Sequence, residues 1–374
     1  MINRIIDFCA HNRFIVLLLV GMSVLSGIHA MRSITLDAIP DLSDTQVIVY
    51  SRWDRSPDIM EDQVTYPIIS ALLGVPMVKD IRGFSDFGYS FVTIIFEDGT
   101  DIYWARSRIV EYLSNILPRL PQGVQVELGK DETAIGWVFQ YALVDTTGKR
   151  NLADLRSLQD WFLRYELQAV PGVAEVAPIG GFVRQYQVNV DPNALSAYRV
   201  SIEKITEAIR QGNNDVGGRL VEFSGREYMI RGRGYIRSIA DVENTVVGLN
   251  PDSGTPILVK HLGRVVLGPD IRRGIGELDG KGETAGGIVI MRYRENALKV
   301  IERVKARLSE IAPNLPKGVK VVTTYDRSDL IERSIETLKH TLTEELIIVS
   351  LVILVFLWHI PSAIIPILTI PIAV

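Results

Sequence analysis

The sequence predicts an α+β membrane protein, in which membrane-spanning helices enclose a duplicated α/β region that lies in water. Three observations lead to this prediction. Long apolar runs lie near both ends of the 374-residue chain, and the charged residues concentrate between them. Two sequence landmarks occur twice in the middle of the chain. The residues around each landmark alternate between the period of a strand and that of a helix.

The first apolar run, Phe14–Met31, contains no Asp, Glu, Lys or Arg. As a helix it would be about 27 Å long, close to the thickness of a bilayer's hydrocarbon core. Arg4 and Arg13 precede it, which favours an amino terminus in the cytoplasm. A cleaved signal peptide is the alternative, but the run is longer than usual and lacks a small-residue cleavage site. We therefore expect residues 1–34 to contain a retained first transmembrane helix.

The second apolar run, Leu346–Ile360, follows an amphipathic stretch that begins at Leu330. We expect residues 328–360 to form one helix that enters the bilayer and becomes the second transmembrane helix, with Trp358 and His359 at the far interface. Pro361 and the residue after it would then turn the chain. The twelve residues that follow are apolar but too few to cross, so we expect 361–374 to begin a third span in a truncated chain.

The repeated landmarks define the middle of the chain. The pattern G-V-x-x-V-x-x-I-x-G-F occurs at Gly74–Phe84 and again at Gly172–Phe182, 98 residues later. The pattern I-x-P-x-L-P-x-G-V-x-V begins Ile116–Asp131 and Ile311–Asp326, which are 195 residues apart. The second copy is therefore 97 residues longer between the two landmarks, which predicts an insertion of about that length.

The first copy, residues 35–133, has the order βαββαβ, which is the ferredoxin-like arrangement. The expected strands are Gln46–Arg52, Met77–Gly83, Tyr89–Glu97 and Val124–Leu128, and the expected helices are Pro57–Leu73 and Asp101–Leu117. The second copy has the same order in two pieces, residues 134–182 and 284–327. Its expected strands are Trp137–Val144, Val173–Ile179, Gly287–Arg292 and Val319–Thr324, and its expected helices are Asp154–Gln168 and Asn296–Ile311.

The insertion, residues 183–283, is expected to form an α+β domain with a strand at Gln185–Val190 and a helix at Ser201–Gln211. The Gly-rich stretch Asn213–Tyr235 predicts an extended hairpin whose tip lies at Gly217 and Gly218. Its mixture of apolar and basic residues leaves two interpretations open, an ordinary surface loop and a contact with another subunit.

The sequence lacks the residues that several classes of function would require. The net charge of −4 gives no electrostatic case for a nucleic-acid partner. No Walker A, G-x-S-x-G or H-E-x-x-H motif occurs, so we assign no catalytic residue and no ATP. The only cysteine is Cys9, so a disulfide framework and a thiolate metal site in the rest of the chain are excluded.

Metal ligands are sparse as well. The five histidines are His11, His29, His261, His340 and His359, and none has another histidine at helical ligand spacing. Four methionines of the middle region, Met60, Met77, Met229 and Met291, are scattered, and we interpret each as a packing residue rather than a Cu(I) ligand. We assign no metal or cofactor-binding residue. Neither complete span contains a carboxylate, so residues beyond Val374 would have to supply any proton coupling.

Five blocks of sequence resemble the heavy-metal branch of the resistance-nodulation-division (RND) efflux pumps. They are IPDLSDTQV (Ile39–Val47), QVTYPI (Gln63–Ile68), FEDGTDIYWARSRIVEYL (Phe96–Leu113), ADLRSLQDWFLRYEL (Ala153–Leu167) and VTTYDRSDLIERSI (Val322–Ile335). The likeness covers essentially the whole chain. It is nearest to the copper/silver pumps and more distant to the cobalt-zinc-cadmium pumps.

The resemblance implies a secondary active transporter in the Gram-negative inner membrane, with a large periplasmic region. Such pumps are homotrimers that use the proton gradient and act with a periplasmic membrane-fusion adaptor and an outer-membrane channel. The two copies would be porter subdomains, and the insertion would be part of the docking domain. The transported substrate would be Cu(I) or Ag(I), otherwise zinc, cobalt or cadmium. The family's metal-binding and proton-relay residues lie beyond Val374.

Two other classes share the topology. A membrane-anchored periplasmic sensor would need a soluble output domain after the second helix, whereas Pro361 leads into another apolar segment. An accessory subunit of protein translocation, of the SecD/SecF kind, would lack the five blocks. A pump predicts about ten further spans and a second periplasmic region that repeats the G-V-x-x-V landmark.

Overall fold

The computed structural model describes residues 9, 11–33, 37, 39, 41–133, 135–251, 253–272, 274–358, 360, 363–365 and 367. It divides into two compact units. The first unit comprises Met1–Thr147, Asp160–Pro178 and Gly286–Val374. The second unit comprises Gly148–Gln159 and Ile179–Ala285. Helices and strands both contribute to each unit, so the fold is α+β as the sequence predicts.

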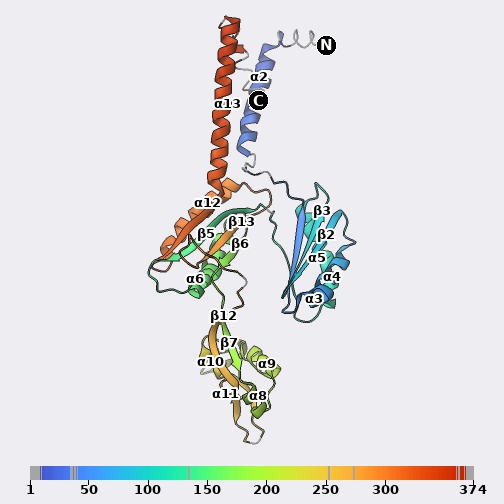
Figure 1. The fold of residues 1–374 in the computed structure, drawn as a ribbon, viewed down its shortest axis with the longest axis vertical. Coiled ribbons are helices and arrows are strands. Elements are labelled where there is room, and N and C mark those ends of the chain that lie inside the picture. Colours follow the sequence, from blue (N-terminus) through green and yellow to red (C-terminus); the bar gives the residue numbers. More distant parts are fainter. Residues whose placement is uncertain are drawn as a thin grey trace. The chain divides into compact units, whose positions relative to one another are not determined.

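The first sheet has four strands in the order β2-β3-β1-β4, and every pair of neighbours is antiparallel. Its strands are β1 (Gln46–Arg52), β2 (Val78–Asp86), β3 (Tyr89–Phe96) and β4 (Gln125–Leu128). Between β1 and β2 lie α3 (Pro57–Met60), η1 (Glu61–Thr65) and α4 (Tyr66–Leu72), and between β3 and β4 lie α5 (Ile102–Ile116) and η2 (Leu117–Arg119). Figure 1 shows β2, β3 and these helices together.

The core of the first sheet follows from its alternating sequence. In β1 the side chains of Val47 and Val49 are buried and their neighbours along the strand are not, as expected for a sheet with one covered face. Ile68 and Ile109, from the two helical segments, complete the same cluster. Asp101 begins α5, because its side chain accepts a 2.8 Å hydrogen bond from the backbone N–H of Trp104.

The second sheet has the order β14-β5-β13-β6. Its strands are β5 (Trp137–Asp145), β6 (Val173–Gly180), β13 (Ala285–Met291) and β14 (Val319–Asp326). The helical segments are α6 (Leu152–Leu158), η3 (Gln159–Leu163) and α7 (Arg164–Gln168), followed later in the chain by α12 (Ala297–Ile311) and η4 (Ala312–Asn314). When the strands of each copy are numbered from one to four along the chain, both sheets have the strand order 4-1-3-2.

The irregular turns recur along with the strands. The π-helical turn η1 (Glu61–Thr65) has a counterpart in η3 (Gln159–Leu163), 98 residues later. The 3₁₀ turn η2 (Leu117–Arg119) has a counterpart in η4 (Ala312–Asn314), 195 residues later. These separations are the ones between the sequence landmarks. The two copies therefore share the same irregular helical turns at equivalent positions. The spacing of apolar residues in the sequence does not predict such turns.

The second unit contains three two-stranded sheets. β7 (Arg184–Val190) pairs with β12 (Gly263–Pro269), β10 (Val246–Leu249) with β11 (Pro256–Leu258), and β8 (Val216–Phe223) with β9 (Arg226–Gly232). Its helices, besides α6, are α8 (Pro192–Tyr198), α9 (Ile202–Gly212), α10 (Ile239–Glu243) and α11 (Val259–Leu262). A small apolar core includes Ile205, Val259 and Leu262, so this unit has a core of its own.

The hairpin β8–β9 forms as predicted, but the predicted position of its tip is wrong. The turn lies at Ser224 and Gly225, whose φ angles of 53° and 72° suit a tight hairpin turn. Gly217 and Gly218 lie within β8 instead, where the register of the pair shifts. A Cβ on Gly218 would come within 2.7 Å of the backbone oxygen of Ile230, so close approach of the two strands explains this glycine.

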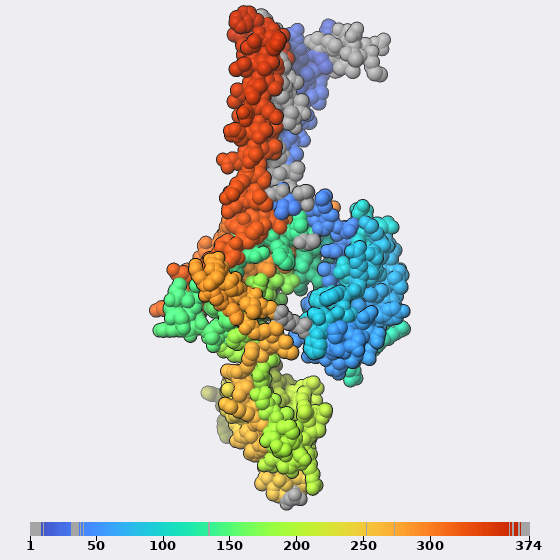
Figure 2. All heavy atoms as spheres, in the orientation of Figure 1, coloured from blue at the N-terminus to red at the C-terminus, as the bar shows by residue number. Residues whose placement is uncertain are grey.

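Two helices of the first unit are long and apolar enough to cross a membrane, α2 (Arg13–Ser33) and α13 (Arg327–Leu357). In the described residues, the most apolar part of each helix is not buried inside the protein. In Figure 2 the upper length of α13 (red) lies on the surface of the molecule. The predicted continuation from Leu330 into the apolar run is confirmed as one helix. Pro361 and the predicted turn lie outside the described residues.

Candidate functional site

The base of α13 is a buried polar cluster. Arg327, whose side chain is 5% exposed, donates through Nη1 to Asp37 Oδ2 at 3.0 Å and through Nη2 to the backbone oxygen of Trp137 at 2.8 Å. Asp37 follows α2, and Trp137 begins β5. The guanidinium of Arg327 thus connects three parts of the chain: the start of α13, the segment after α2, and the second sheet. Its Nε is buried with no hydrogen-bond partner.

Asp326 completes this cluster as the N-cap of α13. Its side chain accepts hydrogen bonds from the backbone N–H of Ser328 at 2.9 Å and from the Ser328 hydroxyl at 2.6 Å. It also forms an ion pair with Lys305 of α12. Burial would raise the pKa of Asp326, but the hydrogen bonds from Lys305 and Ser328 outweigh it and hold this pKa below its usual value. Asp326 is therefore ionised at neutral pH and fixes the start of the helix.

A second polar cluster lies where the chain passes from the first sheet to the second. Asp131, only 7% exposed, accepts hydrogen bonds from the Tyr103 hydroxyl at 3.0 Å and from Arg292 Nη1 at 3.2 Å. Tyr103 belongs to the first copy and Arg292 follows β13 of the second. The backbone oxygen of Asp131 accepts a further bond from the N–H of Tyr293 at 2.9 Å. One carboxylate thus holds parts of both copies.

The neighbouring ionisable groups are strongly shifted. Burial, reinforced by the negative charges of Glu175 and Asp131, raises the pKa of Glu132 to about 7. Burial and a hydrogen bond to Glu127 raise the pKa of Tyr50 to about 12. Glu132 is therefore the group of this cluster that changes its charge near neutral pH.

Sequence reasoning missed both clusters, although it contained a signal for them. Asp131 and Asp326 are the last residues of the two aligned blocks, Ile116–Asp131 and Ile311–Asp326, that begin with the repeated pattern. Each is buried or nearly so, and each accepts hydrogen bonds from elements far from it in sequence. The shared final aspartate could have identified both as junctions.

The histidines of the described residues form no metal site with other ligands. Among the described residues, no three His, Cys, Asp or Glu side chains lie close enough together to hold a metal ion. His261 stacks on Tyr198 with a centroid distance of 6.3 Å, and His359 lies outside the described residues. Met60 and Met291 are buried, as expected for packing residues. That interpretation is wrong for Met77 and Met229, which are 44% and 79% exposed.

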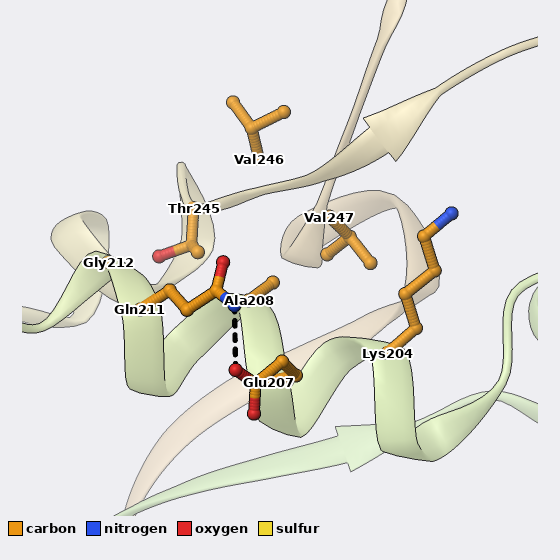
Figure 3. Close-up of a pocket in the computed structure, with 8 residues that line it drawn as sticks. All are labelled: Lys204, Glu207, Ala208, Gln211, Gly212, Thr245, Val246 and Val247. Carbon is orange, nitrogen blue, oxygen red and sulfur yellow. Dashed lines mark hydrogen bonds between the residues drawn. The ribbon is translucent and has the colours of Figure 1, made fainter.

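Two features of the second unit are open to solvent. A shallow groove of about 580 Å³ lies between α9 and β10, where Gln211 donates to Glu207 at 2.7 Å and Lys204 extends toward the other end (Figure 3). Every residue of β8 and β9 is exposed, including the cross-strand pair Leu220 and Met229. Apolar side chains paired in the open are typical of a surface that another protein covers.

Comparison with known proteins defines the class. Residues 5–374 match the AcrB/AcrD/AcrF family, and the chain belongs to it. The putative cation efflux system protein SilA of Salmonella typhimurium and the cation efflux system protein CusA of Escherichia coli (strain K12) are each 47% identical over 372 residues. These residues are 99% of this chain and 35% of each relative.

More distant relatives belong to the same metal-efflux group. The cobalt-zinc-cadmium resistance protein CzcA of Cupriavidus metallidurans is 35% identical over 382 residues, which are 100% of this chain and 36% of CzcA. The crystal structure of a heavy metal efflux pump superposes with a TM-score of 0.86 at 36% identity, covering 98% of this chain and 37% of the pump. The chain thus resembles heavy-metal efflux members of the family over about a third of their length.

Proposed function

We propose that this chain is the amino-terminal part of a proton-driven RND pump that exports Cu(I) or Ag(I) through a tripartite envelope complex. The observation that carries the proposal is the 47% identity with SilA and CusA over 99% of the chain, against 35% with CzcA. Two unburied apolar helices and two sheets of one strand order support it. The complete protein would be a secondary active transporter in the inner membrane, a homotrimer joined to a periplasmic adaptor and an outer-membrane channel.

The parts of the chain take the following roles in this proposal. Residues 35–133 form the first ferredoxin-like porter subdomain, and 134–182 with 284–327 form the second. Residues 183–283 form part of the docking domain. Residues 1–34 and 328–360 hold the first two transmembrane helices, and 361–374 begin the third. The region between the two helices is periplasmic, and the metal ion is cargo rather than a cofactor.

A chimera tests the function. The first third of CusA is replaced by this chain, and the chimera is expressed in an E. coli strain that lacks CusA. We expect growth on silver and copper concentrations that kill the deletion strain, because the chain supplies the parts that a copper/silver pump needs. A matched chimera with the first third of CzcA is the control. Restored growth with the CzcA chimera but not with this chain, at equal expression, would contradict the proposal.

The exposed hairpin β8–β9 is proposed to contact a neighbouring subunit of the trimer. Replacing the paired apolar residues by Leu220→Ser and Met229→Ser should raise the dissociation constant of the trimer by about tenfold or more, since such side chains dominate interfaces. Light scattering at a series of concentrations measures this. The control is Glu222→Gln with Glu227→Gln, a cross-strand pair of the same hairpin. Equal dissociation constants for both double variants would favour an ordinary surface loop.

A further inference from the structure

The passage from the first sheet to the second depends on a short connector, Gly129–Thr133. Its first residue, Gly129, is held by β1 and α5 through two hydrogen bonds. The N–H of Gly129 donates to the backbone oxygen of Ile48 at 2.7 Å, and its oxygen accepts from Arg106 Nη1 at 2.6 Å. Two residues later, the carboxylate of Asp131 accepts one hydrogen bond from Tyr103 of the first copy and another from Arg292 of the second copy. The buried carboxylate of Asp131 is therefore a fixed point between the two sheets.

Glu132, the next residue, is held differently. Its Oε2 atom is inaccessible to solvent and has no hydrogen-bond partner. The charged groups that act on it come from three elements: Glu175 from β6, Arg106 from α5, and Asp131 and Lys130 from the connector itself. Glu175 also acts on Tyr50 of the first sheet, so it lies near both copies. A negative charge on Glu132 thus faces two other carboxylates without a direct hydrogen-bond donor at its buried oxygen.

We propose that the connector Gly129–Thr133 is a proton-controlled hinge between the two sheets, with Asp131 as its fixed point and Glu132 as its sensor. A neutral Glu132 lets β6 and its Glu175 lie against the connector. An ionised Glu132 repels Glu175, and the repulsion moves the second sheet away while Asp131 keeps the two copies attached. The device requires no transported metal and no partner protein.

The direction of the pH effect follows from the chemistry of Glu132. Its pKa rises from the ordinary 4.5 to about 7 in the folded chain, so the folded chain binds this proton more tightly than the unfolded chain does. The stabilisation is complete below pH 4.5, and it is lost as the pH rises through 7. The same linkage applies to the hinge: an arrangement that holds Glu132 close to Glu175 binds the proton more tightly than one that separates them, so mild acid favours the closed arrangement and a pH above neutral favours the open one.

Spin-label distances between the two sheets test the hinge. Arg119 and Asn314 are exposed and occupy equivalent places in the repeated turns η2 and η4. Because Cys9 is the only cysteine, Cys9→Ser with Arg119→Cys and Asn314→Cys gives a doubly labelled chain. The 374-residue chain is placed in lipid nanodiscs, and the distance distribution is measured from pH 5.5 to pH 8.5.

We expect the distribution to lengthen or broaden with rising pH, with a midpoint near pH 7. Glu132→Gln should abolish this change and keep the distribution of pH 5.5 at every pH. Glu302→Gln, an exposed glutamate on α12, is the matched control and should respond as the parent chain does. Asp131→Asn should broaden the distribution at every pH, because the fixed point is weakened. A parent distribution that stays constant over this range, or a full response in Glu132→Gln, would overturn the hinge.

Discussion

Arg327→Gln should destabilise the first unit by about 3–5 kcal/mol, because it leaves the carboxylate of Asp37 without its partner in a largely buried place. The side chains of Arg327 and Asp37 are 5% and 18% exposed, so water can replace only a small part of the lost contact. The backbone oxygen of Trp137 loses its donor as well. Thermal unfolding in detergent, followed by circular dichroism, measures the loss.

Arg82→Gln is the matched control, since Arg82 pairs with Asp80 on the surface, where it is 71% exposed. This variant should unfold at the temperature of the parent chain. The double variant Asp37→Asn with Arg327→Gln should lose less stability than the sum of the single variants, because the two residues form one interaction. If Arg327→Gln unfolds at the same temperature as Arg82→Gln, the buried junction does not stabilise α13.

Leu351→Asp should prevent α13 from inserting into a membrane. Leu351 lies near the middle of the apolar length of this helix, where it is 61% exposed. A carboxylate at the centre of a membrane helix costs about 2.5–3.5 kcal/mol, so the inserted fraction should fall about a hundredfold relative to the non-inserted one. Glycosylation mapping of the segment in microsomes measures this ratio.

Leu351→Phe is the control for this substitution, because it changes the volume of the side chain and keeps it apolar. Its insertion should equal that of the parent segment. Equal insertion of the aspartate variant would mean that this face of α13 does not contact lipid. The face would then belong to a protein contact or to a water-filled cavity.

Helices and strands with a regular hydrophobic pattern could be predicted from the sequence. All four strands of each sheet lie where alternation or a continuous apolar run predicts them, within a few residues. β2 differs most from its prediction, since it begins at Val78 and continues to Asp86, three residues beyond the predicted end. The residues after Gly83 pair with β3 as far as Tyr89, and pairing between strands is not visible in the pattern of one strand.

Contacts between distant residues could not be predicted. Arg327 and Asp37 are 290 residues apart, and Arg292 and Asp131 are 161 apart, so no local period relates them. The structure of the insertion could be predicted least well, for a similar reason. Its short helices and the pairing of β7 with β12 depend on a core whose residues lie both before and after the hairpin β8–β9 in the sequence. The tip of the hairpin was misplaced because a glycine can serve a close backbone approach as well as a turn.

The two π-helical turns have a consequence for the helices that contain them. The hydrogen bonds of a π turn join residues five apart rather than four, so a π turn holds one residue more than an α turn. In η1 the hydroxyl of Thr65 stabilises this irregularity through a 3.2 Å bond to the backbone oxygen of Met60. Since η3 carries the same irregularity at the equivalent place, both copies interrupt the regular helical spacing of their side chains at the same point.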